Sequence, residues 1–241
     1  MSIRIGPVII SANLIFLGVA YIIFARLSFD QLFPGQFAQK SKATICLLGV
    51  SLVGVAGAIL YSLPARLIPM TSEGLSSTMV FSFGSFGGYW GVILGSLCMS
   101  LILKGTPLRQ ADAFVPGILT GGVVARLADV FTRTNQGFSI HVSALPWFQP
   151  FRSWAVFDIA VLLGMLTLVR VSQGARRPPG FVLQLFLVGY GCLRFGIEFL
   201  RNAPSYLGPF AHGQVMALVQ VAAGIVLLVW LRWHRPQRSA A

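Results

Sequence analysis

Two arginines stand inside long apolar stretches of this sequence, where a charged side chain is least expected. Arg126 lies in the stretch 113–131 and Arg194 in the stretch 181–200. A charge at the centre of a bilayer costs at least about 2.5–3.5 kcal/mol on insertion scales, so such a residue normally faces a protein interior and has a task there. Because a planar guanidinium binds two oxygens of an anion at once, these arginines indicate an anion site.

Three carboxylates are spaced so that they can pair with the two arginines. Asp129 follows Arg126 by three residues and Glu198 follows Arg194 by four, so each pair shares one face of a helix. Asp158 lies near the end of a third apolar stretch and is expected at a similar level. Two interpretations stay open: ion pairs that only tie helices together, or an anion site. Asp129 and Asp158 are also candidate general bases if they are desolvated.

The composition requires lipid as the surroundings of most of the chain. Of 241 residues, 56% are hydrophobic and only 10% are charged, with a mean hydropathy of +0.79, whereas a soluble domain carries about 25% charged residues. We therefore predict an all-α integral membrane protein with about seven transmembrane helices in one polytopic domain over 1–241. A span takes about 20 residues. The predicted spans are 5–24, 43–63, 79–103, 113–131, 153–169, 181–200 and 212–230.

The basic residues outside the spans predict the orientation of the chain. Eleven Lys and Arg lie in the first, third and fifth connectors and the C-terminal tail, against five at the N-terminus and in the other connectors. The positive-inside rule then places the N-terminus outside and the C-terminus in the cytoplasm. Arg126 and Arg194 each lie about 13 residues into spans that run outward, roughly 20 Å from the inner boundary. Both are therefore expected in the outer half of the membrane.

Several other function classes find no support in the sequence. The net charge of +12 comes from residues at the ends of apolar stretches, not from the basic face of a soluble module, so no nucleic-acid partner is expected. The three cysteines lack metal-ligand spacing, and no metal site is expected. A transporter would use the two arginines in a polar path, but neither an inverted repeat nor paired broken helices are visible.

Four segments of the chain resemble successive parts of the prolipoprotein diacylglyceryl transferases, and the stretch 5–24 resembles that family's first span more loosely. Their order, span count and orientation also match the family, and together they cover somewhat over half of the chain. No single motif is decisive. The segments are GSFGGYWGVILG (84–95), ADAFVPGILTGGVVARLADVF (111–131), GYGCLRFGIEFLRNAP (189–204) and GQVMALVQVAAGIVLLVW (213–230).

The resemblance implies a reaction, its partners and a location. Such enzymes move the diacylglyceryl group of phosphatidylglycerol to a cysteine thiol in the signal peptide of a prolipoprotein, and they release glycerol phosphate without a cofactor or a metal. They work in the bacterial cytoplasmic (inner) membrane. The family's two phosphate-holding arginines match Arg126 and Arg194. Glu198 and Arg201 continue the motif of the second arginine, and Gln214 matches the start of the last span.

The sequence also departs from the family's pattern. Its His-Gly-Gly signature reads Phe86-Gly87-Gly88 here, so the catalytic histidine is absent, while the two glycines are expected to line a lipid cleft. Asp129 stands where the family has its first Asn, and Asp158 is the one acid left of a further motif. Losing a general base typically removes about 10²–10⁴ in rate.

Two functions therefore stay open. The first is a divergent transferase in which Asp129, Asp158 or another group replaces the missing base. Tyr190, His141 and His212 face or approach the outer side and are further candidates for that role. The second is a phospholipid-binding pseudoenzyme, or a subunit of a membrane complex, in which the arginine cleft is kept and the transfer chemistry is lost.

Overall fold

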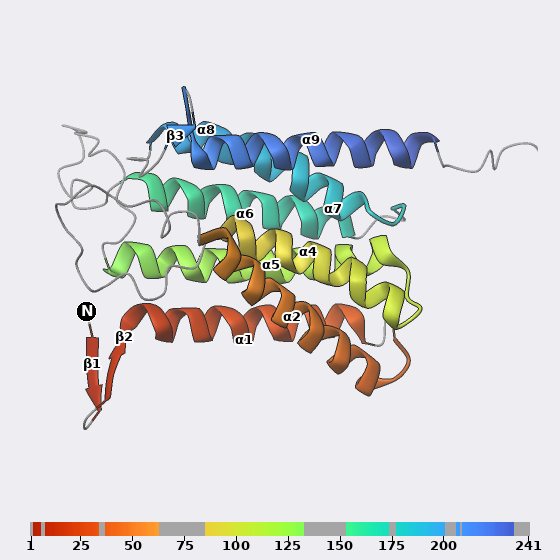
Figure 1. Ribbon diagram of the computed structural model, residues 1–241, viewed down its shortest axis with the longest axis horizontal. Coiled ribbons are helices and arrows are strands. Elements are labelled where there is room, and N and C mark those ends of the chain that lie inside the picture. The colour runs from red at the N-terminus through yellow and green to blue at the C-terminus, as the bar shows by residue number, and fades with distance from the viewer. Residues whose placement is uncertain are drawn as a thin grey trace, which may run out of the picture. The chain divides into compact units, whose positions relative to one another are not determined.

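Long helices make up nearly all of the described chain (Figure 1). The computed structural model describes residues 2–5, 8–33, 37–62, 85–132, 153–173, 177–200, 206–207 and 209–233. Leu, Ile, Val, Ala and Phe dominate the helices, and in a bilayer the helix satisfies every backbone polar group internally. The uninterrupted long helices are α1 (Ala12–Leu32), α2 (Lys40–Ser62), α4 (Ser85–Ile102), α5 (Pro107–Thr132), α6 (Ser153–Gln173) and α9 (His212–Trp233).

The segment 181–200 forms one further spanning helix, but its backbone changes type along the way. It begins as α7 (Phe181–Leu185), continues as the π-helical η3 (Phe186–Tyr190) and returns to an α-helix in α8 (Gly191–Ile197). It ends in the 3₁₀ turn η4 (Glu198–Leu200). Both arginine-bearing stretches are thus helical, and the second one contains a π-turn.

Two short antiparallel hairpins precede helices. β1 (Ser2–Ile5) pairs with β2 (Val8–Ser11) before α1, and β3 (Tyr206–Leu207) pairs with β4 (Phe210–Ala211) before α9. The first hairpin occupies the beginning of the predicted span 5–24, so the helix itself begins later, at residue 12. The β-branched Val and Ile residues at 8–10 favour extended backbone, which gives this shift a local cause.

Among the described residues, six helices are long and apolar enough to cross a membrane. The helix α4 is shorter, with an apolar stretch over Phe86–Ile102, and residues 79–84 of the predicted third span lie outside the described residues. The prediction of an all-α, multi-pass membrane protein is confirmed. The orientation of the termini stays a prediction.

The described helices group into two compact units, and the boundaries fall within α1 and α5. One unit takes the residues up to Arg26 and from Val115 onward, and the other takes Leu27–Phe114. In the first unit α5 lies between α1 and α6, and α9 lies on the far side of α6 (Figure 1). All the predicted ion-pairing residues belong to this first unit. The single domain 1–241 stays a prediction.

In the second unit, α2 and α4 pack backbone against backbone. A Cβ on Gly91 would lie 2.5 Å from the carbonyl oxygen of Val53 and 2.8 Å from the Cα of Gly54. Gly57 and Gly87 approach each other more closely still, so neither has room for a side chain. Small residues allow helices to approach in this way in a bilayer, where van der Waals packing drives their association.

A candidate anionic-lipid site

Arg126 is the centre of an ion-pair network in the first unit. It projects from α5, and its Nη1 lies 2.6 Å from the Oδ2 of Asp129, one turn further along the same helix. Its Nε lies 2.7 Å from the Oδ2 of Asp158, which belongs to α6. The Arg126 side chain is 10% exposed and that of Asp158 is fully buried. The guanidinium therefore joins two helices through two of its edges.

Asp158 extends the network to a third helix. The hydroxyl of Tyr190 donates a long hydrogen bond of 3.5 Å to the Oδ1 of Asp158. Tyr190 is the last residue of η3 and is fully buried. One carboxylate thus forms an ion pair with a guanidinium through one oxygen and accepts a hydrogen bond from a phenol through the other. It connects α5, α6 and the helix 181–200.

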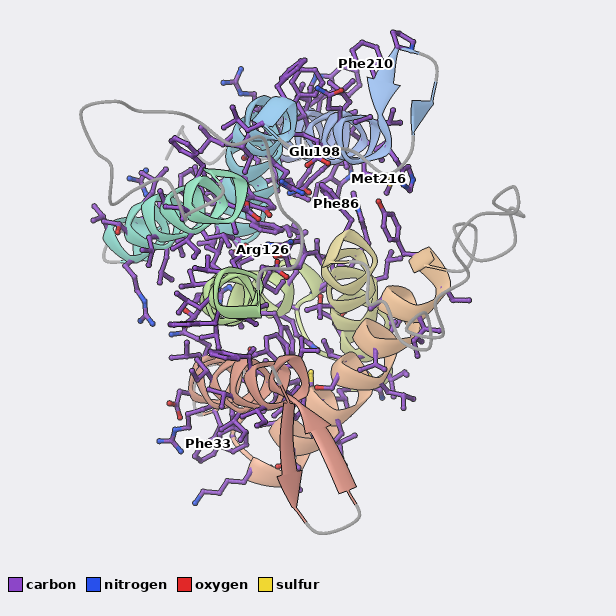
Figure 2. All side chains as sticks on the ribbon, turned by 90° about the vertical axis from the view of Figure 1, so that its left-hand side faces the viewer. Phe33, Phe86, Arg126, Glu198, Phe210 and Met216 are labelled. Atoms are coloured by element: carbon purple, nitrogen blue, oxygen red, sulfur yellow. The ribbon has the colours of Figure 1, made fainter. Side chains whose placement is uncertain are left out.

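Arg194 lies one helical turn after Tyr190 and forms the second ion pair. Its Nη2 lies 2.8 Å from the Oε2 of Glu198, and the two side chains are only 2% and 1% exposed. Because Tyr190 and Arg194 are four residues apart in sequence, they share one face of the helix. Arg194 therefore lies on the same face of the helix 181–200 as Tyr190, whose hydroxyl reaches Asp158 of α6. Figure 2 shows the side chains of Arg126 and Glu198 directed toward the region between the helices of this unit.

The beginning of α9 supports the second ion pair. A Cβ on Gly213 would overlap the carboxylate of Glu198, so that carboxylate lies against the first turn of α9. The positive end of a helix dipole stabilises a negative charge there. Gln214 accepts a hydrogen bond of 2.9 Å from the backbone N–H of Ala211 through its Oε1 and closes the start of the helix, as the Gln of a capping box does.

We call this set the arginine cluster. The pairs Arg126–Asp129 and Arg194–Glu198 were predicted from spacing and are confirmed. Asp158 was predicted as a partner from its similar level in the membrane, and its pairing with Arg126 is confirmed as well. The contact with Tyr190 was not predicted as a contact, because nothing in local spacing relates residues 158 and 190. The members of the cluster are Arg126, Asp129, Asp158, Tyr190, Arg194 and Glu198.

The formal charge of the arginine cluster bears directly on anion binding. Two guanidinium groups face three carboxylates, so the cluster carries a net charge of −1 when all five are ionised. An incoming phosphate must therefore displace a carboxylate from an arginine or arrive together with a proton. Asp129 is the most accessible of the three acids, with a side chain 12% exposed. It is therefore the carboxylate that an anion entering the cluster would reach most easily.

The other predicted site residues have different surroundings. Gly87 is covered by the Gly57 backbone and the Cβ of Tyr61, whereas a Cβ on Gly88 would meet nothing closer than the Cβ of Ala58 at 3.8 Å. Arg201 lies outside the described residues. A place for these three in a lipid site stays a prediction.

The residue at the family's histidine position is deeply buried. Phe86 is only 3% exposed, and its ring lies 6.3 Å from that of Tyr61. No group of three or more His, Cys, Asp or Glu that could hold a metal ion occurs among the described residues.

The helices and the buried cluster together define a multi-pass membrane protein with a polar centre of arginines and carboxylates. The sequence model of the prolipoprotein diacylglyceryl transferases matches residues 3–230. The chain therefore belongs to the prolipoprotein diacylglyceryl transferase family.

Individual relatives agree with the family model. The chain is 30% identical to the phosphatidylglycerol–prolipoprotein diacylglyceryl transferase of Chlorobaculum tepidum over 85% of its own length and 76% of the relative's. It is 29% identical to the transferase of the same name from Verminephrobacter eiseniae over 86% of its length and 80% of the relative's. With the corresponding protein of Klebsiella pneumoniae the identity is 29%, over 86% and 83%.

Proposed function

We propose that the chain transfers the diacylglyceryl group of phosphatidylglycerol to the cysteine thiol of a prolipoprotein signal peptide. The observation that carries the proposal is the family match over residues 3–230, together with relatives named for this reaction that align over most of both chains. Bacterial relatives and six apolar helices among the described residues support a multi-pass protein of the cytoplasmic membrane. The orientation expected from the basic residues would place the arginine cluster in the outer half of that membrane.

In this reaction the sulfur forms a bond to the terminal glyceryl carbon, and the bond from that carbon to the phosphate oxygen breaks. Glycerol phosphate leaves with the electron pair of that bond, and the thiol gives its proton to a base. Arg126 and Arg194 bind the phosphate, because guanidinium groups placed where negative charge grows stabilise the transition state. Fixed donors in a site shielded from water stabilise that charge more strongly than water does.

The structure favours Asp129 over Asp158 as the group that takes the thiol proton. The carboxylate of Asp158 is fully buried and is already engaged by Arg126 and Tyr190. Asp129 contacts Arg126 at 2.6 Å and is partly exposed. When the phosphate takes over Arg126, the Asp129 carboxylate is released beside the substrate, where it can accept the thiol proton.

A second candidate function is phospholipid binding without group transfer. It is favoured by one observation, the buried phenyl ring of Phe86 at the position that the resemblance assigns to a catalytic histidine. A phenyl ring neither accepts nor donates a proton. Under this alternative the arginine cluster still holds an anionic headgroup.

Purified protein incubated with labelled phosphatidylglycerol and a peptide carrying a lipoprotein signal-peptide cysteine separates the two candidates. Transfer predicts a peptide whose mass rises by one diacylglyceryl group, with equimolar glycerol phosphate, and no product from the Cys→Ser peptide. Lipid retained without any product supports the binding function and contradicts the transferase. In that case Phe86→His is expected to remain without transfer, because other family positions have changed as well.

A further inference from the structure

The helix 181–200 changes its hydrogen-bond register just before the arginine cluster. η3 (Phe186–Tyr190) is π-helical, while the residues on either side are α-helical. Single π-turns inside α-helices are rare and often lie at functional sites. A π-turn adds one residue, and one residue corresponds to a rotation of about 100° around the axis and a rise of about 1.5 Å. The directions of Tyr190 and Arg194 therefore depend on this turn.

Gln220 of α9 contacts the first residue of the π-turn. Its Nε2 donates a long hydrogen bond of 3.4 Å to the carbonyl oxygen of Phe186. The Gln220 side chain is buried, with only 1% of the residue exposed. In a bilayer, backbone groups displaced from the regular α-helical pattern need partners from neighbouring helices. The Gln220 amide supplies such a partner at the point where the pattern changes.

Glycines hold α9 close to the π-turn on both sides of Gln220. A Cβ on Gly191 would lie 3.2 Å from the carbonyl oxygen of Ala217 and 2.8 Å from the Cγ2 of Val221. A Cβ on Gly224 would lie 2.6 Å from the Cγ2 of Val188. The helix that carries Gln220 is therefore in direct contact with the π-turn over more than one helical turn.

The amide oxygen of Gln220 indicates that glutamine is not the side chain that would give the highest folding stability at this position. Its Oε1 is buried and has no hydrogen-bond partner among the described residues. A buried acceptor without a partner destabilises a protein, and an apolar side chain of similar size would not carry that penalty. An apolar side chain could not donate the hydrogen bond that the Gln220 amide donates to the carbonyl oxygen of Phe186.

The π-turn connects Gln220 to the arginine cluster through two aromatic rings. The ring of Phe186 stacks on that of Tyr190, with centroids 5.4 Å apart and planes 6° from parallel. The hydroxyl of Tyr190 then reaches Asp158, the residue that holds Arg126. The path from Gln220 to Arg126 thus consists of direct contacts between buried groups.

We propose that Gln220 is a positioning residue, which stabilises the π-turn and thereby directs Tyr190 at Asp158 and Arg194 into the arginine cluster. Gln220 itself touches none of the reacting groups. Its effect on the reaction rests on the proposed transferase function, whereas its effect on the direction of Tyr190 does not.

The orientation of Tyr190 is tested first, in protein labelled with 3-fluorotyrosine and observed by fluorine NMR. The chain has only five tyrosines, and Tyr190→Phe identifies the resonance of interest. We expect Gln220→Met to move that resonance in the direction produced by Asp158→Asn. Val219→Met is the control, because Val219 is the neighbouring residue and is 47% exposed. We expect this variant to leave the Tyr190 resonance unchanged. A Tyr190 resonance unchanged in Gln220→Met overturns the proposal.

The rate of transfer and the thermal stability are then measured on the same variants. We expect Gln220→Met to lower the turnover number about 10- to 100-fold, as displacements of about 1 Å in a site do, at an unchanged or higher melting temperature. A lower melting temperature with an unmoved Tyr190 resonance shows a merely structural role and contradicts the proposal. If the wild type transfers no lipid, the proposed function fails, and the resonance alone decides the role of Gln220.

Discussion

The side chain of Arg126 contacts two carboxylates at once, one on its own helix and one on α6. This arrangement explains how a cation is kept inside a membrane helix, since each charge has a close partner. It also means that the arginine is not freely available to a phosphate. At the residue scale, the binding of a lipid headgroup that we propose for Arg126 would therefore be a competition with Asp129 and Asp158.

Asp129→Asn tests that competition. Removing one carboxylate changes the formal charge of the arginine cluster from −1 to 0 when all its groups are ionised, so we expect phosphatidylglycerol to bind about tenfold more tightly, a gain of about 1.4 kcal/mol. Folding stability should fall by about 1–3 kcal/mol, because the pair is mostly buried and Arg126 loses one of its charged partners. Titration of the lipid in detergent gives the affinity.

The same variant has an opposite effect on transfer if Asp129 is the base. Tighter lipid binding combined with a fall in turnover agrees with both roles of Asp129. Affinity equal to the wild type would show that Asp129 and the headgroup do not compete for Arg126.

Sequence spacing predicted the pairs Arg126–Asp129 and Arg194–Glu198, because residues three and four apart on a helix share a face. It did not predict the hydrogen bond from Tyr190 to Asp158, which depends on how two helices are rotated against each other. The π-turn that sets this rotation has no local signal in the sequence. The part of the site that depends on long-range packing thus had to come from the structure.

At the scale of the elements, two close helix contacts depend on glycines at particular positions. Gly213 brings the first turn of α9 against the Glu198 carboxylate, and Gly91 brings α4 against the backbone of α2. Both glycines belong to segments singled out in the sequence, but which of the many glycines are essential was not predictable. Only the neighbouring atoms distinguish a glycine in contact from one with open space around it.

Gly213→Ala is expected to push Glu198 away from Arg194. The added methyl group overlaps the carboxylate, and overpacking of this kind costs about 1–3 kcal/mol of folding stability. We expect a lower melting temperature and reduced retention of phosphatidylglycerol. Gly196→Ala is the matched control, since a Cβ there meets nothing within 4 Å. Equal behaviour of the two variants would refute the contact between Glu198 and α9.

Gly91→Ala is expected to separate α2 from α4. Its methyl group would lie 2.5 Å from the carbonyl oxygen of Val53, so the helices must move apart and the melting temperature should fall. Gly88→Ala, three residues earlier on α4, should be tolerated, because its Cβ would lie 3.8 Å from the nearest atom, the Cβ of Ala58. Destabilisation by Gly88→Ala alone would contradict the described packing. A loss of lipid binding without loss of stability in Gly88→Ala would support its predicted place in a lipid cleft.

At the scale of the whole molecule, composition was enough to predict an all-helical membrane protein, because so few charged residues cannot cover a surface facing water. The helix count and most of the predicted spans followed from the lengths of the apolar stretches. The beginning of the first span was placed too early, since hydropathy does not distinguish the apolar hairpin β1–β2 from a helix. The orientation of the chain rests on its basic residues and stays a prediction.

Family membership adds the reaction to this architecture, and we propose that the buried arginine cluster is the place where this reaction occurs. A polar cluster inside a membrane protein is costly to maintain, so its presence agrees with a functional site. If the cluster only tied helices together, replacing an arginine by lysine would affect stability and leave lipid binding as it was.

The measurement that tests the central claim most directly is the amount of phosphatidylglycerol bound to purified Arg126→Lys and Arg194→Lys, determined by native mass spectrometry. Lysine keeps a cation beside the buried carboxylates but cannot form the bidentate hydrogen bonds by which arginine binds a phosphate. We predict that each variant retains at least about tenfold less of this lipid, and that the double variant loses little more, because both arginines serve one site. Phosphatidylglycerol bound at wild-type levels in both single variants would contradict the account.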